Sequence, residues 1–208
     1  MDVKQNLDVI VYHLLIESLY NVEYKAGQIL NPSEIAEFYN ISKTPVLQAL
    51  KRLETEKILE LSNNGKYKLV CPDANNIKDI CETRFMFESY AVSKLIDEFD
   101  DDMYSKLMVH VNKCKSVSEV AETKEILKAD YSFHKCLIGL LRNETISEFY
   151  EPMINRFILL KYTSGYRRDL QWIIENSYLF HKEITELLRQ KKRAELLEYI
   201  QEHIYFEE

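Results

Sequence analysis

Three histidines and one aspartate occur where helical spacing places leucine and isoleucine side chains, so we expect all four to point into a helical interior. Asp130 and His134 are four residues apart, so both lie over one turn and could hold one ion. A buried aspartate is costly without a partner, and imidazoles from other helices would complete a nitrogen-rich site for Zn, Ni or a similar divalent ion. The predicted ligands are Asp130, His134, His181 and His203.

Two alternatives remain for these four residues. A lone histidine in a core is more often simply hydrogen-bonded, and we expect that role, or surface exposure, for His13 and His110, which lack such companions. Helical Asp/His clusters also activate water in metal-dependent hydrolases. The sequence contains no HExxH motif, however, and no general base can be identified beside the predicted site.

A second candidate site is a short basic segment in an acidic chain. Residues 43–68 hold six basic and three acidic residues, whereas the whole chain has a net charge of −7. Pro45 suits the first turn of a helix, whose free N–H groups and neighbouring hydroxyls and cations could bind phosphate. The predicted DNA-contacting residues are Ser42, Lys43, Thr44, Leu47, Gln48, Lys51 and Arg52 on this helix, and Asn64, Gly65 and Lys66 in the following turn.

The elements around this segment predict a winged helix-turn-helix. Apolar spacing indicates helices at 5–21 and 33–39, the latter with Ile35 and Phe38 inward, and a third helix that begins near residue 43. Asn40 suits a left-handed turn between the last two helices. Asn63-Asn64-Gly65 predicts a hairpin between 59–62 and 66–71, and 28–30 could add a very short strand. The alternative is a winged helix that binds protein.

The remainder of the chain reads as helical. The chain has only four glycines and four prolines in 208 residues, which argues against β-sandwiches, β-barrels and Rossmann folds. We expect a winged-helix domain over 1–71, a linker over 72–76 and an all-helical domain over 77–208. The expected helices in that second domain cover about 77–97, 101–117, 122–141, 144–163, 170–190 and 192–205. The predicted fold class is therefore mainly α.

The segment ISKTPVLQALKRLETEKIL resembles the signature of GntR-family bacterial transcription regulators. The matching positions include Ser42, Thr44, Pro45, Val46 and Glu54. Lys43 and Leu47 stand where relatives carry DNA-contacting arginines, Gln48 replaces a glutamate, and Lys57 replaces a glycine. Because leucine cannot donate a hydrogen bond, the resemblance implies DNA binding with an operator unlike the usual one.

Residues 77–208 resemble the FCD effector domain of the FadR subfamily. The motifs are Arg84-x-x-x-Glu88, Asp130-x-x-Phe133-His134, Asn143 and the pair His181 and His203. The resemblance implies the metal-binding branch, with Zn, Ni or Mn held by the Asp and three His, and a small organic acid completing the coordination. It also offers Arg84 and Arg156 as carboxylate clamps. The alternatives are an i, i+4 ion pair with Glu88 for Arg84, and a surface role for Arg156.

These features together predict an effector-responsive regulator, with repression the expected direction, that binds operator DNA as a homodimer. Two-fold symmetry would let two recognition helices read a palindrome. No run approaches the roughly 18 apolar residues of a membrane span, and charged residues interrupt the first apolar stretch, so we expect a cytoplasmic protein without a membrane partner. A metal-dependent hydrolase and a protein-binding winged helix with a structural metal are the competing functions.

Overall fold

The computed structural model describes residues 7–21, 23–62, 64–71, 73–118, 123–163 and 168–206. Contacts divide the chain into two compact units. One runs to Pro72 and includes Arg156–Gly165, and the other comprises Asp73–Asn155 and Tyr166–Glu208. The expected second domain holds every residue from 77 onward. In the structure, residues 156–165 belong instead to the first unit, although the residues on both sides of them in the sequence belong to the second.

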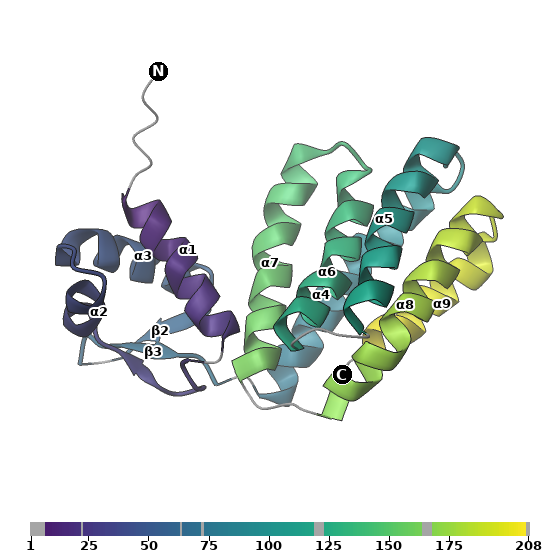
Figure 1. The fold of residues 1–208 in the computed structure, drawn as a ribbon. Coiled ribbons are helices and arrows are strands. Elements are labelled where there is room, and N and C mark those ends of the chain that lie inside the picture. The colour runs from purple at the N-terminus through teal and green to yellow at the C-terminus, as the bar shows by residue number, and fades with distance from the viewer. Residues whose placement is uncertain are drawn as a thin grey trace, which may run out of the picture. The chain divides into compact units, whose positions relative to one another are not determined.

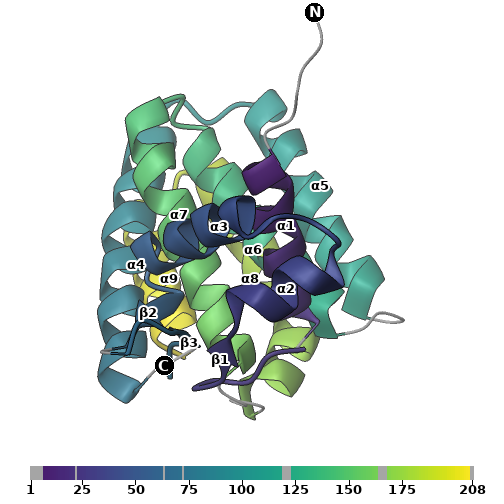
Figure 2. The same ribbon diagram turned by 90° about the vertical axis from the view of Figure 1, so that its left-hand side faces the viewer.

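The first unit consists of helices and a small sheet (Figure 2), together with the end of the helix that includes Arg156. Helix α3 (Lys43–Thr55) packs against α1 (Leu7–Tyr20) and α2 (Pro32–Phe38). Strands β1 (Ile29–Leu30), β2 (Leu59–Leu61) and β3 (Tyr67–Leu69) form an antiparallel sheet in the order β1-β3-β2. This is the predicted sequence of helices, short strand and hairpin. The predicted turn residue Asn63 lies outside the described residues.

The turn between α2 and α3 is mostly as predicted. Asn31 caps α2 by accepting a hydrogen bond from the Ser33 amide, and Asn40 adopts a φ of 51°. Ile35 is buried, but Phe38 is 81% exposed, so its predicted inward orientation is wrong. The buried face of this short helix is centred between Ile35 and Ala36, and at about 100° per residue Phe38 lies beyond its edge.

Helix α3 buries one face and exposes the other, as its sequence predicts. Val46, Leu50 and Leu53 are fully buried. The chain leaves the helix through Lys57, which has a φ of 60°, a left-handed conformation that glycine adopts at less cost than lysine. The hairpin turns at Gly65, whose φ is 75°.

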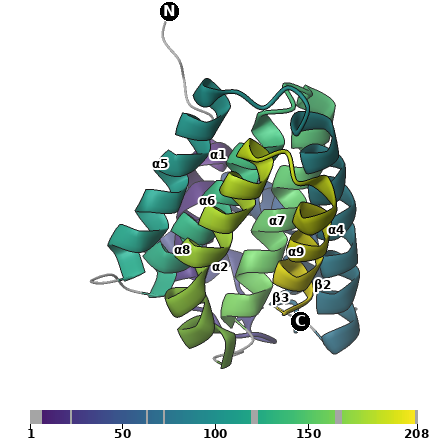
Figure 3. The same cartoon turned by 90° about the vertical axis from the view of Figure 1, so that its right-hand side faces the viewer.

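The second unit is helical (Figures 1 and 3). Its central helix is α6 (Thr123–Gly139), which packs against α4 (Ala74–Leu95), α5 (Asp101–Ser118) and α8 (Arg168–Arg189). Helix α9 (Arg193–Phe206) packs against α4 and α8, and α7 (Glu144–Thr163) follows α6 in the chain. This packing lets side chains from α4, α6, α8 and α9 meet inside one bundle.

Local capping fixes where these helices begin. Asp73 and Asn76 form a capping box, in which the Asn76 amide donates to Asp73 Oδ1 at 2.8 Å. Residues 74–76, expected in the linker, are therefore the first turn of α4. At α7, the Ile146 amide donates to Asn143 Oδ1 at 3.2 Å. Within the described residues, no helix is both long and apolar enough to cross a membrane.

Candidate functional site

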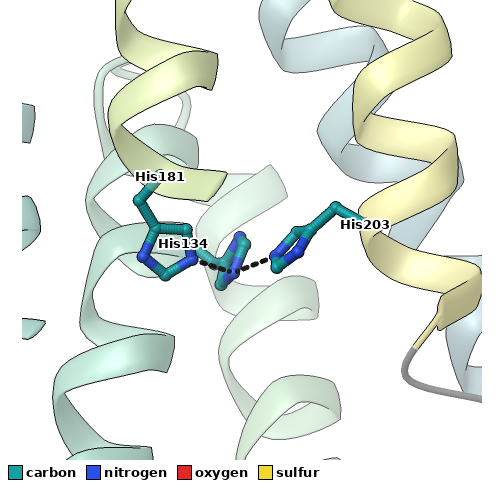
Figure 4. Close-up of side chains that lie close together, drawn as sticks. All are labelled: His134, His181 and His203. Carbon is teal, nitrogen blue, oxygen red and sulfur yellow. Dashed lines mark hydrogen bonds between the residues drawn. The ribbon is translucent and has the colours of Figure 1, made fainter. Parts of the chain in front are cut away.

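The three predicted histidine ligands meet in the interior of the second unit. His134 from α6 lies between His181 from α8 and His203 from α9 (Figure 4). The Nε2 atom of His134 is 3.0 Å from His181 Nε2 and 3.3 Å from His203 Nε2. All three rings are buried, and one ligand atom from each lies within 4.8 Å of the other two. The predicted inward orientation of these side chains is confirmed.

These separations fit a single divalent ion. Zinc lies about 2.0–2.1 Å from imidazole nitrogens, so two tetrahedral nitrogen ligands are about 3.3 Å apart. The observed Nε2 separations of 3.0 and 3.3 Å are close to that value. Neutral imidazoles suit Zn, Ni and similar metals. The donor set therefore matches the kind of ion that the sequence predicts.

Asp130 lies four residues before His134 on the same face of α6. Its carboxylate is buried, and Oδ1 lies 3.5 Å from His181 Nε2. On the other side of that ring, Cys114 Sγ lies 3.6 Å from His181 Nδ1. His181 is thus held between a carboxylate at one nitrogen and a thiol at the other, which leaves Nε2 directed toward His134 and Asp130.

A buried glutamate on α4 orients the histidine cluster, which consists of His134, His181 and His203, by a hydrogen bond to His134. Glu88 Oε2 accepts a hydrogen bond from His134 Nδ1 at 3.0 Å, which leaves Nε2 of that ring to face the other histidines. Its Oε1 accepts from Arg84 Nε and from the Tyr150 hydroxyl, each at 2.7 Å. A carboxylate behind a histidine is the usual way in which proteins orient a metal ligand and raise its basicity.

The electrostatic environment keeps His181 neutral. Burial, followed by the neighbouring imidazoles of His134 and His203 and then the Arg84 guanidinium, holds the pKa of His181 well below its usual range. Burial, followed by the negative charge of Glu88, raises the pKa of the Tyr150 hydroxyl well above its ordinary value. A neutral imidazole is the form that binds metals, because its nitrogen lone pair is available.

The two arginines predicted as effector clamps differ in position. Arg84 is completely buried, and the expected i, i+4 pair with Glu88 is present. Its Nη2 also lies 2.7 Å from His134 Nε2, so Arg84 belongs to the histidine cluster. Arg156 is partly buried in the middle of α7 and is grouped with the first unit, while the cluster belongs to the second. Its role as a clamp stays a prediction.

The two other histidines differ from the cluster. His13 is exposed. His110 is partly buried, and its Nδ1 lies 2.8 Å from the Ser132 hydroxyl. Both observations agree with the expectation that these residues are surface or hydrogen-bonded histidines.

The exposed face of α3 carries the residues predicted to contact DNA. Ser42 is the N-cap residue, and its exposed side chain makes no capping hydrogen bond. Leu47 is 42% exposed. Thr44, Leu47, Gln48 and Lys51 from α3 and Tyr67 from β3 line a shallow surface hollow. The other predicted helix contacts, Lys43 and Arg52, are also exposed.

Two of the predicted basic contacts are already engaged within the protein. Lys51 Nζ pairs with Glu54 at 2.5 Å. Arg52 Nε donates to Glu56 Oε1 at 3.1 Å, and its guanidinium stacks 3.7 Å from the centroid of the Tyr12 ring. Tyr12 in turn donates to Glu56 Oε2 at 2.7 Å. Arg52 therefore joins α3 to α1, whereas no such pair holds Lys43 among the described ion pairs.

The turn of the hairpin is fixed by Ser62. Its hydroxyl donates to the Lys66 carbonyl at 2.8 Å and contacts Asn64, and the Gly65 amide donates to the Ser62 carbonyl at 2.9 Å. Asn64, Gly65 and Lys66 are all exposed. The three predicted wing residues thus lie at the tip of a hydrogen-bonded turn.

Comparison with known proteins assigns two consecutive parts of the chain to known families. Residues 8–65 match the model for bacterial regulatory proteins of the gntR family, and residues 79–206 match the FCD domain. The chain belongs to the GntR family. It is a DNA-binding transcription regulator, and the matched families and relatives are regulators and not enzymes.

Individual relatives of this GntR regulator are distant. The Nta operon transcriptional regulator of Aminobacter aminovorans is 28% identical over 181 residues, covering 87% of this chain and 83% of the relative. The gluconate operon transcriptional repressor of Bacillus subtilis is 23% identical, covering 86% and 74%. The solved structure of E. coli McbR/YncC has a TM-score of 0.76 at 18% identity, covering 97% and 96%. At this identity, the structural likeness shows a shared fold.

Two residues of the regulator's histidine cluster are not evident from the sequence. The sequence indicates Glu88 only as a partner of Arg84, and it does not single out Tyr150. The i, i+4 spacing of Arg84 and Glu88 is the same in surface ion pairs, so it does not reveal burial. Tyr150 lies on an amphipathic helix as ordinary apolar residues do. A buried tyrosine needs a hydrogen-bond partner, but sequence spacing alone could not identify Glu88 as that partner.

Proposed function

We propose that this GntR regulator represses transcription by placing α3 and the hairpin turn on a palindromic operator as a homodimer. The exposed hydroxyl of Ser42, the exposed ammonium of Lys43 and the absence of a side-chain cap at Ser42 support phosphate contacts at the start of α3. Leu47 and Gln48 face the same side and supply apolar and amide groups for base edges. We propose repression as the direction of regulation because the gluconate operon relative is named a transcriptional repressor.

We also propose that the FCD domain binds one divalent metal ion through Asp130, His134, His181 and His203. The observation that carries this proposal is the approach of three imidazoles from three helices, with ligand atoms within 4.8 Å of one another. When bound, such an ion supplies a Lewis acid that can take a carboxylate oxygen from a small organic acid. Glu88 would hold His134 in the ligating tautomer, and Arg84 would attract the acid's second oxygen.

Coupling between effector and operator requires different affinities in two states. Three helices contribute histidines, so an ion and its acid would bind best to one arrangement of α6, α8 and α9. An effector that favours one arrangement of the FCD domains shifts the population of dimers competent to bind DNA. Effector binding and operator binding would then oppose each other reciprocally.

Metal content tests the FCD half of the proposal. Protein purified without a metal-affinity tag is incubated with Zn, Ni or Mn, desalted and analysed for bound metal. We expect about one ion per chain in the wild type and none in the His134→Ala/His181→Ala variant. His110→Ala is the matched control, because it removes a partly buried histidine outside the cluster. A wild type without metal would reduce the cluster to a hydrogen-bonded core.

A gel shift tests the DNA-binding half and separates the competing function. The full chain is titrated against DNA from upstream of its own gene, in the presence and absence of a panel of small organic acids. We expect a shift that Lys43→Ala weakens and that at least one acid releases. Failure to distinguish this DNA from an unrelated fragment would favour a winged helix that binds protein.

A further inference from the structure

The guanidinium of Arg84 lies among the nitrogen atoms that would hold the metal ion. Its Nη2 is 2.7 Å from His134 Nε2 and 3.5 Å from His203 Nε2. Its Nε donates to Glu88 Oε1 at 2.7 Å, and the side chain has no exposed surface. A fixed positive charge thus stands at the centre of a site whose expected ligand is also a cation.

Arg84 occupies the same lone pair of His134 that a metal ion would need. Arginine has only donors and stays charged in proteins, so His134 Nε2 must accept its hydrogen bond through the ring's lone pair. The other ring nitrogen then carries the proton, consistent with its 3.0 Å contact to Glu88 Oε2. This is also the tautomer that binds metal through Nε2, and one lone pair cannot serve both partners at once.

We infer that Arg84 is an internal competitor of the metal ion: it contacts His134 and His203 in the metal-free protein and must leave His134 Nε2 before an ion can bind. The inference rests on the metal site proposed above. A rotation about the Cδ–Nε bond of Arg84 would move Nη2 away from His134, and the Nε–H bonded to Glu88 would turn with it because the guanidinium is planar. The displaced guanidinium would then stand beside a divalent cation, an arrangement that favours an anion between them.

Zinc affinity of the full chain tests this inference. Wild type and Arg84→Met are titrated with Zn²⁺ alone in competition with a chromophoric chelator, and thermal unfolding is recorded in EDTA. Methionine keeps similar length and removes the charge and the donors. We expect Arg84→Met to bind zinc at least about tenfold more tightly, a change of about 1.4 kcal/mol, and to unfold at a lower temperature when metal-free.

Arg193→Met is the matched control. It makes the same chemical change at an exposed arginine that pairs with Asp97 at 2.8 Å, so zinc affinity should not change. Wild type and Arg84→Met with equal affinities, or weaker binding by Arg84→Met, would overturn the inference while the metal site stands. Absence of zinc binding by both proteins would overturn the metal site, and the inference with it.

A measurement on the wild type covers the case in which Arg84→Met does not fold, since that change leaves Glu88 buried without its cation. Arginine side-chain ¹H–¹⁵N spectra are recorded before and after one equivalent of Zn²⁺. We expect slowly exchanging Arg84 Nη protons in the metal-free protein, which shift or disappear with zinc. Zinc bound to the histidines with unchanged Arg84 signals would overturn the inference.

Discussion

Glutamine in place of Glu88 is the smallest change that tests the buried network. The carboxylate accepts hydrogen bonds from Arg84 Nε and the Tyr150 hydroxyl at 2.7 Å and from His134 Nδ1 at 3.0 Å. All four side chains are buried. Removing one partner of a buried ion pair costs about 3–5 kcal/mol, because the remaining charge is left uncompensated. We expect Glu88→Gln to lower the free energy of unfolding by that amount.

The side-chain amide that Glu88→Gln introduces cannot satisfy its neighbours in either orientation. Its NH₂ group would face either His134 Nδ1 or Arg84 Nε, and both are donors in the present arrangement. The orientation that keeps the Arg84 Nε contact pushes the His134 proton to Nε2, where it opposes Arg84 Nη2 and removes the lone pair needed for metal. Because outer-shell partners of metal ligands are worth about 10–100-fold in affinity, zinc binding should weaken within that range.

Urea unfolding in EDTA and zinc titration by chelator competition measure the two effects. Glu82→Gln is the control, because it makes the same change at an exposed position of α4. Tyr150→Phe removes one hydrogen bond to the charged acceptor and should cost about 1.5–3 kcal/mol. A loss below about 1 kcal/mol for Glu88→Gln, with zinc affinity unchanged, would refute the argument that Glu88 neutralises Arg84 and orients His134.

Four further outcomes follow from named residues. Lys57→Gly should raise the free energy of unfolding by about 0.5–1 kcal/mol in urea titrations, because a φ of 60° strains lysine more than glycine loses in entropy. Lys43→Ala should weaken operator binding with a shallower salt dependence in fluorescence anisotropy, and an unchanged slope would exclude a phosphate contact. Leu47→Arg should move base preference from thymine toward guanine at one position in a selection from random DNA, unless its side chain serves only packing. Burial and then Lys113 lower the pKa of His110, so the folded state binds fewer protons. The stabilisation that comes from this pKa difference is complete above about pH 6.5 and is lost as pH falls toward the lowered pKa of His110. His110→Gln should therefore flatten the measured dependence of the free energy of unfolding on pH.

Sequence periodicity was sufficient for the helices of the second unit because they are long and amphipathic. The expected helix over 144–163 is α7 (Glu144–Thr163), and the expected 101–117 is α5 (Asp101–Ser118). The convergence of three histidines was accessible for the same reason. A polar residue at a core position of a regular helix can be recognised from the sequence, because the apolar residues around it predict that its side chain points inward.

What sequence could not supply was the identity of partners across helices. Arg84 and Glu88 have the spacing of a solvent-exposed ion pair, and only the packing of α4 against α6 and α9 reveals that both are buried beside His134. The predicted inward orientation of Phe38 was wrong for a different reason. A seven-residue helix has too few positions to define its buried face, so hydrophobicity alone was a poor guide to orientation.

The cost of this polar core bears on why a regulator would contain it. Arg84, Glu88 and Asp130 are charged groups buried among three imidazoles. Burying ion pairs adds little net stability, and apolar residues of similar volume often serve a bundle as well or better. A purely apolar core, however, would offer an ion or an acid nothing to prefer in one helix arrangement over another. A ligand shifts a conformational equilibrium only by its difference in affinity between the states. In the proposed mechanism, His134 on α6 would exchange the Arg84 guanidinium for a metal ion, and Arg84 on α4 would turn to the carboxylate of an effector. Such exchanges would involve side chains from two helices.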